Sequence, residues 1–133
     1  MTRLDIVLKT DLTERQAHHL NERLLAPEHK NDNGPCRVWH IYEVALYAFV
    51  EREKALPIGI AEASGRPIAT PGWWIDSEYR GAHYGNELVD LLAEQLKSEG
   101  VTGIGRITID TYLGTYNEQS SRLAQRIRKH FNA

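Results

Sequence analysis

The residues best suited to chemistry lie in one segment, residues 73–86, with the sequence WWIDSEYRGAHYGN. The segment leaves an apolar run, passes two glycines, Gly81 and Gly85, and enters a stretch of helical periodicity. The first N–H groups of a helix have no partner within the helix and carry the positive end of its dipole, and Arg80 adds a fixed positive charge. This combination is suited to binding an anion such as a phosphate. The alternative is an ordinary turn in which the glycines only supply backbone freedom.

A single small domain has to position this segment. The chain has 133 residues, of which 41% are apolar and 26% charged, which is typical of one compact domain with its own core. Its net charge of -2 does not favour a general nucleic-acid or anionic-membrane binder. The one cysteine, Cys36, excludes an internal disulfide and a multi-cysteine zinc site. The longest apolar stretch, residues 44–50, is too short to span a membrane, and the N-terminus lacks a signal-peptide core. We therefore expect one soluble cytoplasmic domain, residues 1–133, without a metal site.

The periodicity of apolar residues predicts eight elements in the order β-α-β-β-β-α-β-α. The expected strands are residues 4–8, 44–50, 58–63, 68–75 and 106–111. The expected helices are residues 11–25, a helix that includes residues 88–96, and residues 115–131. The first helix is expected to begin with a capping box at Asp11–Glu14. Short connections between the second, third and fourth strands imply an antiparallel meander, whereas a helical crossover implies a parallel final pair. The expected fold class is therefore α/β (α+β), a mainly antiparallel sheet flanked by helices.

The anion-binding segment contains neither a P-loop nor a Rossmann glycine pattern. It resembles instead the acyl-coenzyme A loop of the GNAT N-acetyltransferase superfamily. The sequence pattern of that loop is Gln/Arg-x-x-Gly-x-Gly/Ala, where x is any residue. Arg80 and Gly85 match this pattern, and His83 stands at the place of the middle glycine. With ordinary backbone dihedrals His83 would still present its N–H group, and its imidazole can add a phosphate contact.

Two further runs resemble the same family. Residues 75–81 are similar to its run of a hydrophobic residue, Asp or His, Pro, Glu, Tyr, Arg and Gly, with Ser77 in place of proline. Asn117, Ser120 and Leu123 are similar to its Asn-x-x-Ala-x-x-Leu pattern. The family usually continues with two strands that this sequence lacks, so we expect either a homodimer that covers the sheet edge or an open cleft for a large acceptor.

The resemblance implies that acetyl-CoA donates an acetyl group to an amine of a small molecule or protein by direct attack on the thioester. The implied donor-binding residues are Trp74, Ile75, Asp76, Arg80, Gly81, Ala82, His83, Tyr84, Gly85, Asn86, Asn117 and Ser120. The pantetheine arm would lie between the fourth and fifth strands where they splay apart. Pro71 and Gly72 suit that place and favour a bulge or interrupted pairing there, although they can also simply mark an edge.

Such a transfer needs a group that takes a proton from the incoming amine. Glu62 is the first candidate, because strand alternation places it on the face of Ile58 and Ile60, where burial raises the pKa of a carboxyl group. The alternative is that the strand end emerges into solvent there. Glu43, Glu78 or a water-mediated route are the other options.

The group that protonates the leaving thiolate is less evident. The tyrosine that the family often has for this role falls on Ala124. Tyr116 is the replacement candidate, followed by Tyr112, and each can equally be a packing residue. The sequence thus predicts an N-acetyltransferase, and the alternative is a degenerate relative that binds coenzyme A or a protein partner without turnover.

Two further features of the sequence have open roles. Trp39, Trp73 and Trp74 suit either the core or an aromatic wall of the acceptor cleft, and alternation places Trp73 and Trp74 on opposite faces of the sheet. The last helix is basic, with Arg122, Arg126, Arg128 and Lys129. These cations suit the ribose phosphate of the donor or a nucleic acid, and they also complement the C-terminal end of the helix dipole.

Overall fold

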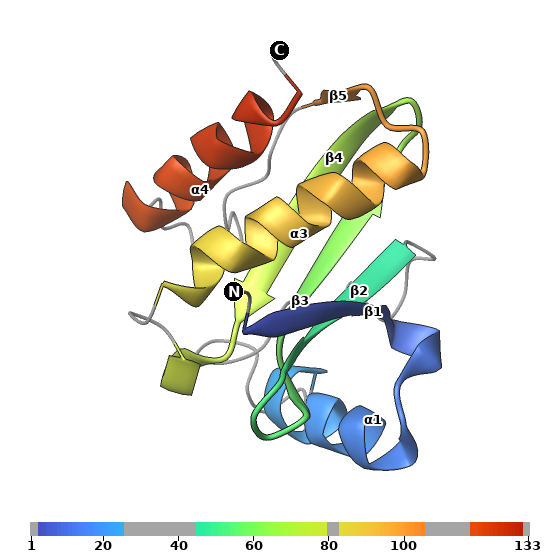
Figure 1. Cartoon of the computed structure of the whole chain (residues 1–133), viewed down its shortest axis with the longest axis vertical. Coiled ribbons are helices and arrows are strands. Elements are labelled where there is room, and N and C mark those ends of the chain that lie inside the picture. Colours follow the sequence, from blue (N-terminus) through green and yellow to red (C-terminus); the bar gives the residue numbers. More distant parts are fainter. Residues whose placement is uncertain (1–2, 26–44, 80–82, 106–117, 132–133) are drawn as a thin grey trace.

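A computed structural model describes residues 3–25, 45–79, 83–105 and 118–131. Its main elements are β1 (Leu4–Leu8), α1 (Glu14–Leu20), β2 (Ala45–Glu51), β3 (Leu56–Ser64), β4 (Ile68–Ile75), α3 (Tyr84–Ser98), β5 (Gly103–Ile104) and α4 (Glu118–Lys129) (Figure 1). The predicted order of strands and helices is confirmed, and so is the mixed α/β class. The fifth strand predicted at 106–111 lies outside these ranges, and β5 precedes it.

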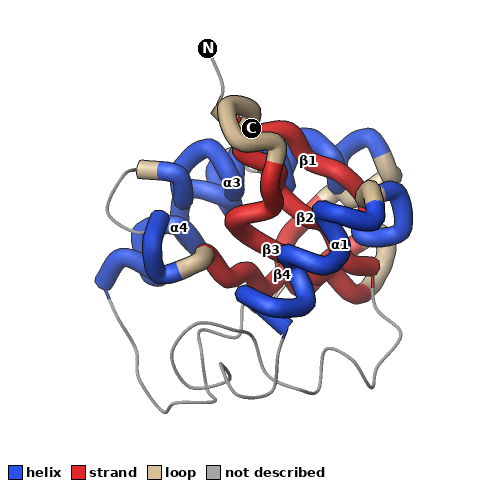
Figure 2. The backbone as a smooth tube through the Cα atoms, turned by 90° about the horizontal axis from the view of Figure 1, so that it is seen from below, coloured by secondary structure: helices blue, strands red, loops and turns tan. Residues whose placement is uncertain are grey.

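The strands form one sheet in the order β1-β2-β3-β4-β5. The first four are antiparallel neighbours, and β5 pairs with β4 in parallel, as the connection lengths predicted. Figure 2 shows α3 and α4 on one side of the strands and α1 on the other. In the described part of the chain, no helix combines the length and apolar character needed to cross a membrane.

The main core lies between the sheet and α3. Leu88, Leu92 and Leu96 are fully buried along one face of α3 and pack against Phe49 of β2, while Ile127 joins them from α4. Residues four apart on a helix share one face, so the leucine spacing alone selects the side of α3 that meets the sheet. The predicted helical stripe is therefore confirmed as the centre of the core.

A smaller core lies under α1 on the opposite face of the sheet. Leu20 and Ile60 are fully buried there, with Leu12 and Trp74 packed against them. Trp73 packs instead into the main core, which confirms that the two neighbouring tryptophans lie on opposite faces. Trp39 lies outside the described residues.

The first helix begins later than the sequence predicted. Residues Lys9–Asp11 form a 3-10 turn, and the capping box is made by Thr13 and Gln16 rather than by Asp11 and Glu14. The Gln16 backbone N–H donates to Thr13 Oγ1 at 3.2 Å, and the Thr13 N–H donates to Gln16 Oε1 at 3.0 Å. Gln16 Nε2 also donates to the Ala55 carbonyl at 3.1 Å, which joins the start of the helix to the β2–β3 turn. This longer-range contact favours the later register.

The bulge predicted at Pro71–Gly72 is wrong. In the pairing of β4 with β3, Ala63 lies opposite Pro71 and Glu62 opposite Gly72, without a shift in register. The irregularity lies between β2 and β3, where Phe49 faces Gly59 and Val50 faces Pro57. Ile58 is the extra residue of this bulge.

The bulge also corrects the predicted face of Glu62. Ile58 packs into the main core with α3, whereas Ile60 packs under α1. A bulge reverses the alternation of side chains along a strand, so Glu62 shares its face with Ile60 and not with Ile58. The local residue pattern contains no sign of this reversal.

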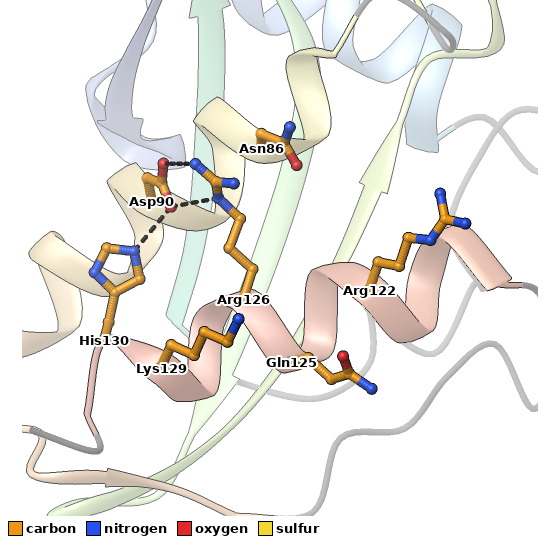
Figure 3. Close-up of a pocket in the computed structure, with 7 residues that line it drawn as sticks. All are labelled: Asn86, Asp90, Arg122, Gln125, Arg126, Lys129 and His130. Carbon is orange, nitrogen blue, oxygen red and sulfur yellow. Dashed lines mark hydrogen bonds and ion pairs between the residues drawn. The ribbon is translucent and has the colours of Figure 1, made fainter.

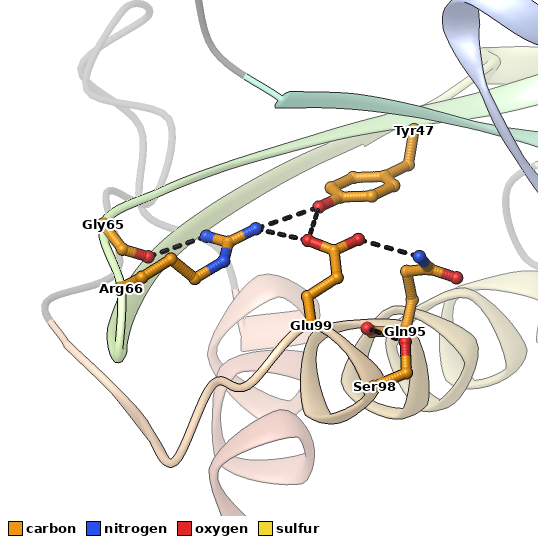
Figure 4. A network of polar contacts seen from close by, with 6 residues as sticks. All are labelled: Tyr47, Gly65, Arg66, Gln95, Ser98 and Glu99. Carbon is orange, nitrogen blue, oxygen red and sulfur yellow. Dashed lines mark hydrogen bonds and ion pairs between the residues drawn. The ribbon is translucent and has the colours of Figure 1, made fainter.

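At the far end of the sheet, a polar network joins the β3–β4 turn to the end of α3 (Figure 4). Glu99 accepts hydrogen bonds from the Tyr47 hydroxyl at 2.8 Å, from Gln95 Nε2 at 2.7 Å and from Arg66 Nη2. Burial, with a further contribution from Glu99, raises the pKa of Tyr47 to about 12. Tyr47 thus stays protonated and donates to Glu99, and the network holds α3 in register with the sheet.

Candidate functional site

The chain leaves β4 through a buried carboxylate, Asp76, which is 1% exposed. Arg23 donates to both of its oxygens, from Nε at 3.1 Å and from Nη2 at 2.8 Å, and the Glu78 N–H donates to Oδ1 at 3.0 Å. Burial opposes ionisation, but the hydrogen bonds from Arg23 and Glu78 outweigh it and lower the pKa of Asp76. Asp76 therefore fixes the start of the 3-10 turn Ser77–Tyr79, which leads into the predicted anion-binding loop. A direct contact of Asp76 with the donor stays a prediction.

Arg23 was missed by sequence reasoning. It lies in the π-helical turn Asn21–Leu25 that continues α1, and its contact with Asp76 spans 53 positions of the chain. No local pattern marks such a pair, because it depends on how α1 packs across the sheet.

His83 has a left-handed backbone, with φ 64° and ψ 17°, and directly precedes α3. The condition under which His83 would present its N–H group in the ordinary way is therefore not met. Glycine adopts this conformation without steric cost, whereas any other residue is strained in it. The chain has thus kept a glycine-like backbone at the position where the resembling pattern has its middle glycine. The His83 side chain does not cap the helix, so it leaves the first N–H groups of α3 to other partners.

Replacing His83 by glycine is expected to raise the free energy of unfolding by about 1 kcal/mol, because it removes the left-handed strain. Urea denaturation of the purified protein measures this change. His83→Ala is the matched control, since alanine loses the imidazole but keeps the strain. Equal stabilities of the glycine and alanine variants would show that the strain is not the cause.

The first turn of α3 carries Tyr84, Gly85 and Asn86, three of the predicted donor-binding residues. Its acidic residue, Glu87, accepts the Arg3 backbone N–H at 2.6 Å and pairs with the Arg3 guanidinium. The same guanidinium lies 3.8 Å from the centre of the Tyr84 ring. Arg3 thus compensates the negative charge of Glu87 and leaves the helix N-terminus attractive to an anion.

Gly85 permits a close approach of the last helix. A Cβ atom at this position would lie 3.0 Å from Leu123 Cδ1 of α4, which is tighter than ordinary packing. The glycine of the resembling motif therefore serves helix packing in this protein. Gly81, Ala82 and Arg80, the other residues of the loop, lie outside the described ranges.

The parallel pairing of β4 with β5 can be followed as far as Gly105 in the described residues. The Gly105 N–H donates to the Ala69 carbonyl at 2.7 Å. In a regular parallel ladder the next bond would run from the N–H of residue 71 to the Gly105 carbonyl, and Pro71 has no N–H. Pro71 therefore cannot donate the next hydrogen bond of this ladder.

Glu62 lies on β3 opposite Gly72, on the α1 face that it shares with Trp74. It is half-buried, and burial raises the pKa of its carboxyl group. Within the described part of the chain, no hydrogen bond or ion pair holds this carboxylate. Glu62 therefore combines a raised pKa with an oxygen available to a ligand, which is what a proton acceptor needs. Its predicted partner Tyr116 lies outside the described residues, as do Asn117 and the alternatives Glu43 and Tyr112.

A groove of about 590 Å³ runs between α3 and α4 (Figure 3). Its lining residues are Asn86, Asp90, Arg122, Gln125, Arg126, Lys129 and His130. Ser120 lies in the first turn of α4. A smaller hollow of about 360 Å³ lies beside α1 and includes His18 and His19. Across the described ranges, no group of three His, Cys, Asp or Glu side chains is arranged to hold a metal ion.

Neither a protein-family model nor a curated protein sequence matches this chain. Solved structures do match it. A protein of Vibrio cholerae, named as a ribosomal-protein-serine acetyltransferase, superposes with a TM-score of 0.61 at 20% identity, over 96% of this chain and 79% of that one. An acetyltransferase of Agrobacterium tumefaciens superposes with a TM-score of 0.56 at 17% identity, over 92% and 78% of the two chains. One from Trypanosoma brucei gives a TM-score of 0.51 at 19% identity, over 86% and 94%.

Proposed function

We propose that this protein, whose fold is that of the GNAT acetyltransferases, transfers an acetyl group from acetyl-CoA to an amine. The observation that carries the proposal is the left-handed backbone of His83, whose side chain does not cap the N-terminus of α3. The acyl-coenzyme A loop of the resembling family has at this position its middle glycine, a residue that adopts this conformation readily. Helix N-terminal N–H groups are suited to the pyrophosphate of the donor. The N–H groups at the start of α3 are therefore suited to binding coenzyme A.

The donor would lie along β4. The resemblance implies that the amide groups of the pantetheine arm pair with backbone groups between the fourth and fifth strands. The bound donor supplies the activated acetyl thioester. The pyrophosphate would contact the first turn of α3, with Arg80 adding charge.

The chemical step is a direct attack of the amine nitrogen on the thioester carbonyl carbon. Glu62 accepts a proton from the amine, and the raised pKa of this carboxyl group brings it closer to that of the group it deprotonates. The new C–N bond forms, the C–S bond breaks, and the thiolate takes up a proton, for which Tyr116 is the proposed donor. Holding the amine and the thioester next to each other contributes much of the remaining rate enhancement over the uncatalysed reaction.

Calorimetric titration with acetyl-CoA, followed by an assay of thiol release over a panel of small amines and peptides, tests the proposal. We expect saturable binding and thiol release with at least one acceptor. Arg80→Ala is expected to weaken donor binding about tenfold or more, because it removes a charge-assisted contact with phosphate. Arg15→Ala, an exposed arginine on α1, is the control. Unchanged affinity of the Arg80 variant would contradict the loop assignment.

Pro71→Ala tests the opening between β4 and β5. Alanine restores the N–H that the parallel ladder lacks, so the strands are expected to pair one step further and the donor to bind several-fold more weakly. The extra hydrogen bond is expected to add about 1 kcal/mol to the free energy of unfolding. Pro57→Ala, in the neighbouring strand β3, controls for the general effect of removing a proline. Stronger donor binding by the Pro71 variant would disprove the role of this residue.

The second candidate function is binding of coenzyme A without turnover. It is favoured by Ala124, which is 2% exposed in the main core where the resembling pattern has its catalytic tyrosine. Donor binding without thiol release for any acceptor would support it. The predicted homodimer and cytoplasmic location stay predictions, and light scattering of the purified protein tests the first of them.

A further inference from the structure

The two tyrosines that flank residues 80–83 are in contact with each other. Tyr79 ends the 3-10 turn that follows β4, and Tyr84 is the first residue of α3. Their ring centroids are 5.7 Å apart and their planes are inclined by 74°, which is the edge-to-face arrangement that aromatic pairs favour. Both rings also pack against the main core. The two ends of the predicted donor loop are therefore joined by one ring contact, the Tyr79–Tyr84 pair.

A cation lies against each ring of this pair. The Arg3 guanidinium lies 3.8 Å from the centre of the Tyr84 ring, and Lys54 Nζ lies 5.8 Å from the centre of the Tyr79 ring. Both distances are within the range of a cation–π interaction. Arg3 is itself held by its ion pair with Glu87 of α3, and Lys54 belongs to the turn between β2 and β3. The pair is thus connected to three other parts of the fold.

The contact is made by the rings and not by the hydroxyl groups. Within the ranges that the structure describes, neither the Tyr79 hydroxyl nor the Tyr84 hydroxyl takes part in a hydrogen bond. A phenylalanine would therefore preserve the edge-to-face contact, whereas an aliphatic residue would remove it. This difference provides a conservative substitution for the test below.

The pair also bears on the strained backbone of His83. A residue other than glycine stays in the left-handed region only where its surroundings hold it there. His83 directly precedes Tyr84, whose ring is in contact with both Tyr79 and Arg3. A loop that is ordered before its ligand arrives binds more tightly, because less conformational freedom is lost on binding.

We propose that the Tyr79–Tyr84 pair closes the donor loop at its base and so raises the affinity of this loop for the pyrophosphate of coenzyme A. The proposal rests on the proposed function, because it takes residues 80–86 as the anion site. It goes beyond that function in assigning part of the donor affinity to the Tyr79 ring, which acts through Tyr84. Tyr79 is thus a positioning residue and not a catalytic one.

Calorimetric titration of the full chain with coenzyme A tests this role without any acetyl transfer. Tyr79→Leu is expected to weaken binding about three- to tenfold, which is the factor that corresponds to the energy of one aromatic pair. Leucine fills part of the space of the ring but makes no edge-to-face contact. Tyr79→Phe retains the ring and is expected to retain most of the affinity.

Phe131→Leu is the matched control for the loss of an aromatic ring from the core. Phe131 also packs against the main core, and Lys97 Nζ lies 5.5 Å from the centre of its ring. It follows the C-terminal end of α4, whereas the donor loop precedes α3. We expect Tyr79→Leu and Phe131→Leu both to lower the free energy of unfolding in urea, and only Tyr79→Leu to lower the affinity for coenzyme A.

Tyr84→Leu tests the same contact from its other side. Because the two rings act as one unit, the double variant Tyr79→Leu/Tyr84→Leu should bind coenzyme A little more weakly than Tyr84→Leu alone. Tyr84→Leu also provides the measurement if the Tyr79→Leu variant does not fold. Fully additive losses of affinity would show that the two rings act separately and would overturn the proposal.

The remaining outcomes separate the proposal from the function on which it rests. Unchanged affinity in a folded Tyr79→Leu variant would overturn the proposal and leave the proposed function intact. An equal loss in Tyr79→Phe would also overturn it, because the hydroxyl group and not the ring would then be responsible. An equal loss in Phe131→Leu would assign the effect to general stability, with the same consequence. Failure of the unmodified chain to bind coenzyme A would overturn both.

Discussion

Replacing Glu62 by glutamine is expected to lower kcat/KM for the acceptor amine by about 10²–10⁴-fold, which is the usual contribution of a positioned general base. Glutamine has nearly the same size but cannot take up the proton of the amine. Donor affinity is expected to change little, because Glu62 lies on β3 and not at the end of β4 or the start of α3. Thiol-release kinetics at saturating acetyl-CoA measure the effect.

The pH dependence of the reaction provides a second test of Glu62. Burial raises the pKa of this carboxyl group, so its deprotonated form is lost at a higher pH than for an exposed glutamate. The rate should therefore rise with pH through a midpoint above the ordinary pKa of glutamate. This limb of the profile should disappear in the Glu62 variant.

Glu94→Gln is the matched control for these measurements, since its side chain is 67% exposed on α3. It is expected to keep the full rate and the full pH profile. If Glu62→Gln kept its activity while Glu43→Gln or Glu78→Gln lost it, the base would be one of these other carboxylates.

Replacing Arg23 by methionine is expected to lower the free energy of unfolding by about 3 kcal/mol, because it leaves a buried carboxylate without its partner. Asp76 is 1% exposed, whereas the Arg23 side chain is 30% exposed. Most of the loss in stability therefore comes from the buried, unpaired charge of Asp76. This expected loss of stability lies at the lower end of the range for breaking a buried ion pair, because Arg23 is partly exposed to water. Urea denaturation at neutral pH measures the change.

The sign of the pH effect follows from the lowered pKa of Asp76 in the folded protein. Its contribution to stability is present above the unfolded-state pKa of aspartate, near 4, and is lost as the pH falls through the folded-state value. The difference between Arg23→Met and the wild type should therefore shrink in acid. Arg52→Met is the matched control, because its ion pair with Asp5 is about half exposed on both sides and is expected to contribute little to stability.

A loss of donor affinity in a folded Arg23 variant would show that the pair also serves the loop. Asp76 accepts the Glu78 N–H and thereby holds the 3-10 turn Ser77–Tyr79, which precedes the predicted loop. Asp76→Asn should reproduce the loss, and the double variant should add little to either single change, since the two residues act as one unit. Strictly additive effects on the free energy of unfolding would contradict this coupling.

Much of the fold could be predicted because its signals are local. The leucine spacing of α3 selects its buried face, and the short strand connections require antiparallel neighbours. The glycines and Arg80, which lie within a few positions of each other, mark the segment that is predicted to bind an anion. Each of these features depends on residues that are close in sequence, and so the pattern contains the information.

Other features were decided only by tertiary structure. The bulge at Ile58 puts Ile58 on the opposite face from Ile60 and Glu62, because a register shift depends on the neighbouring strand. The left-handed backbone of His83 depends on the chain at both ends of its turn, and histidine by itself disfavours it.

The sequence by itself determined the order of elements, the apolar faces of the helices and the residues able to bind an anion, since these follow from chemical type and short-range spacing. Only the tertiary structure decided that Arg23 neutralises Asp76 and that α3 and α4 run parallel with a basic groove between them. The physical reason is that charges far apart in the chain interact only after packing has brought their elements into one register. Residue spacing along a single helix contains nothing about that register.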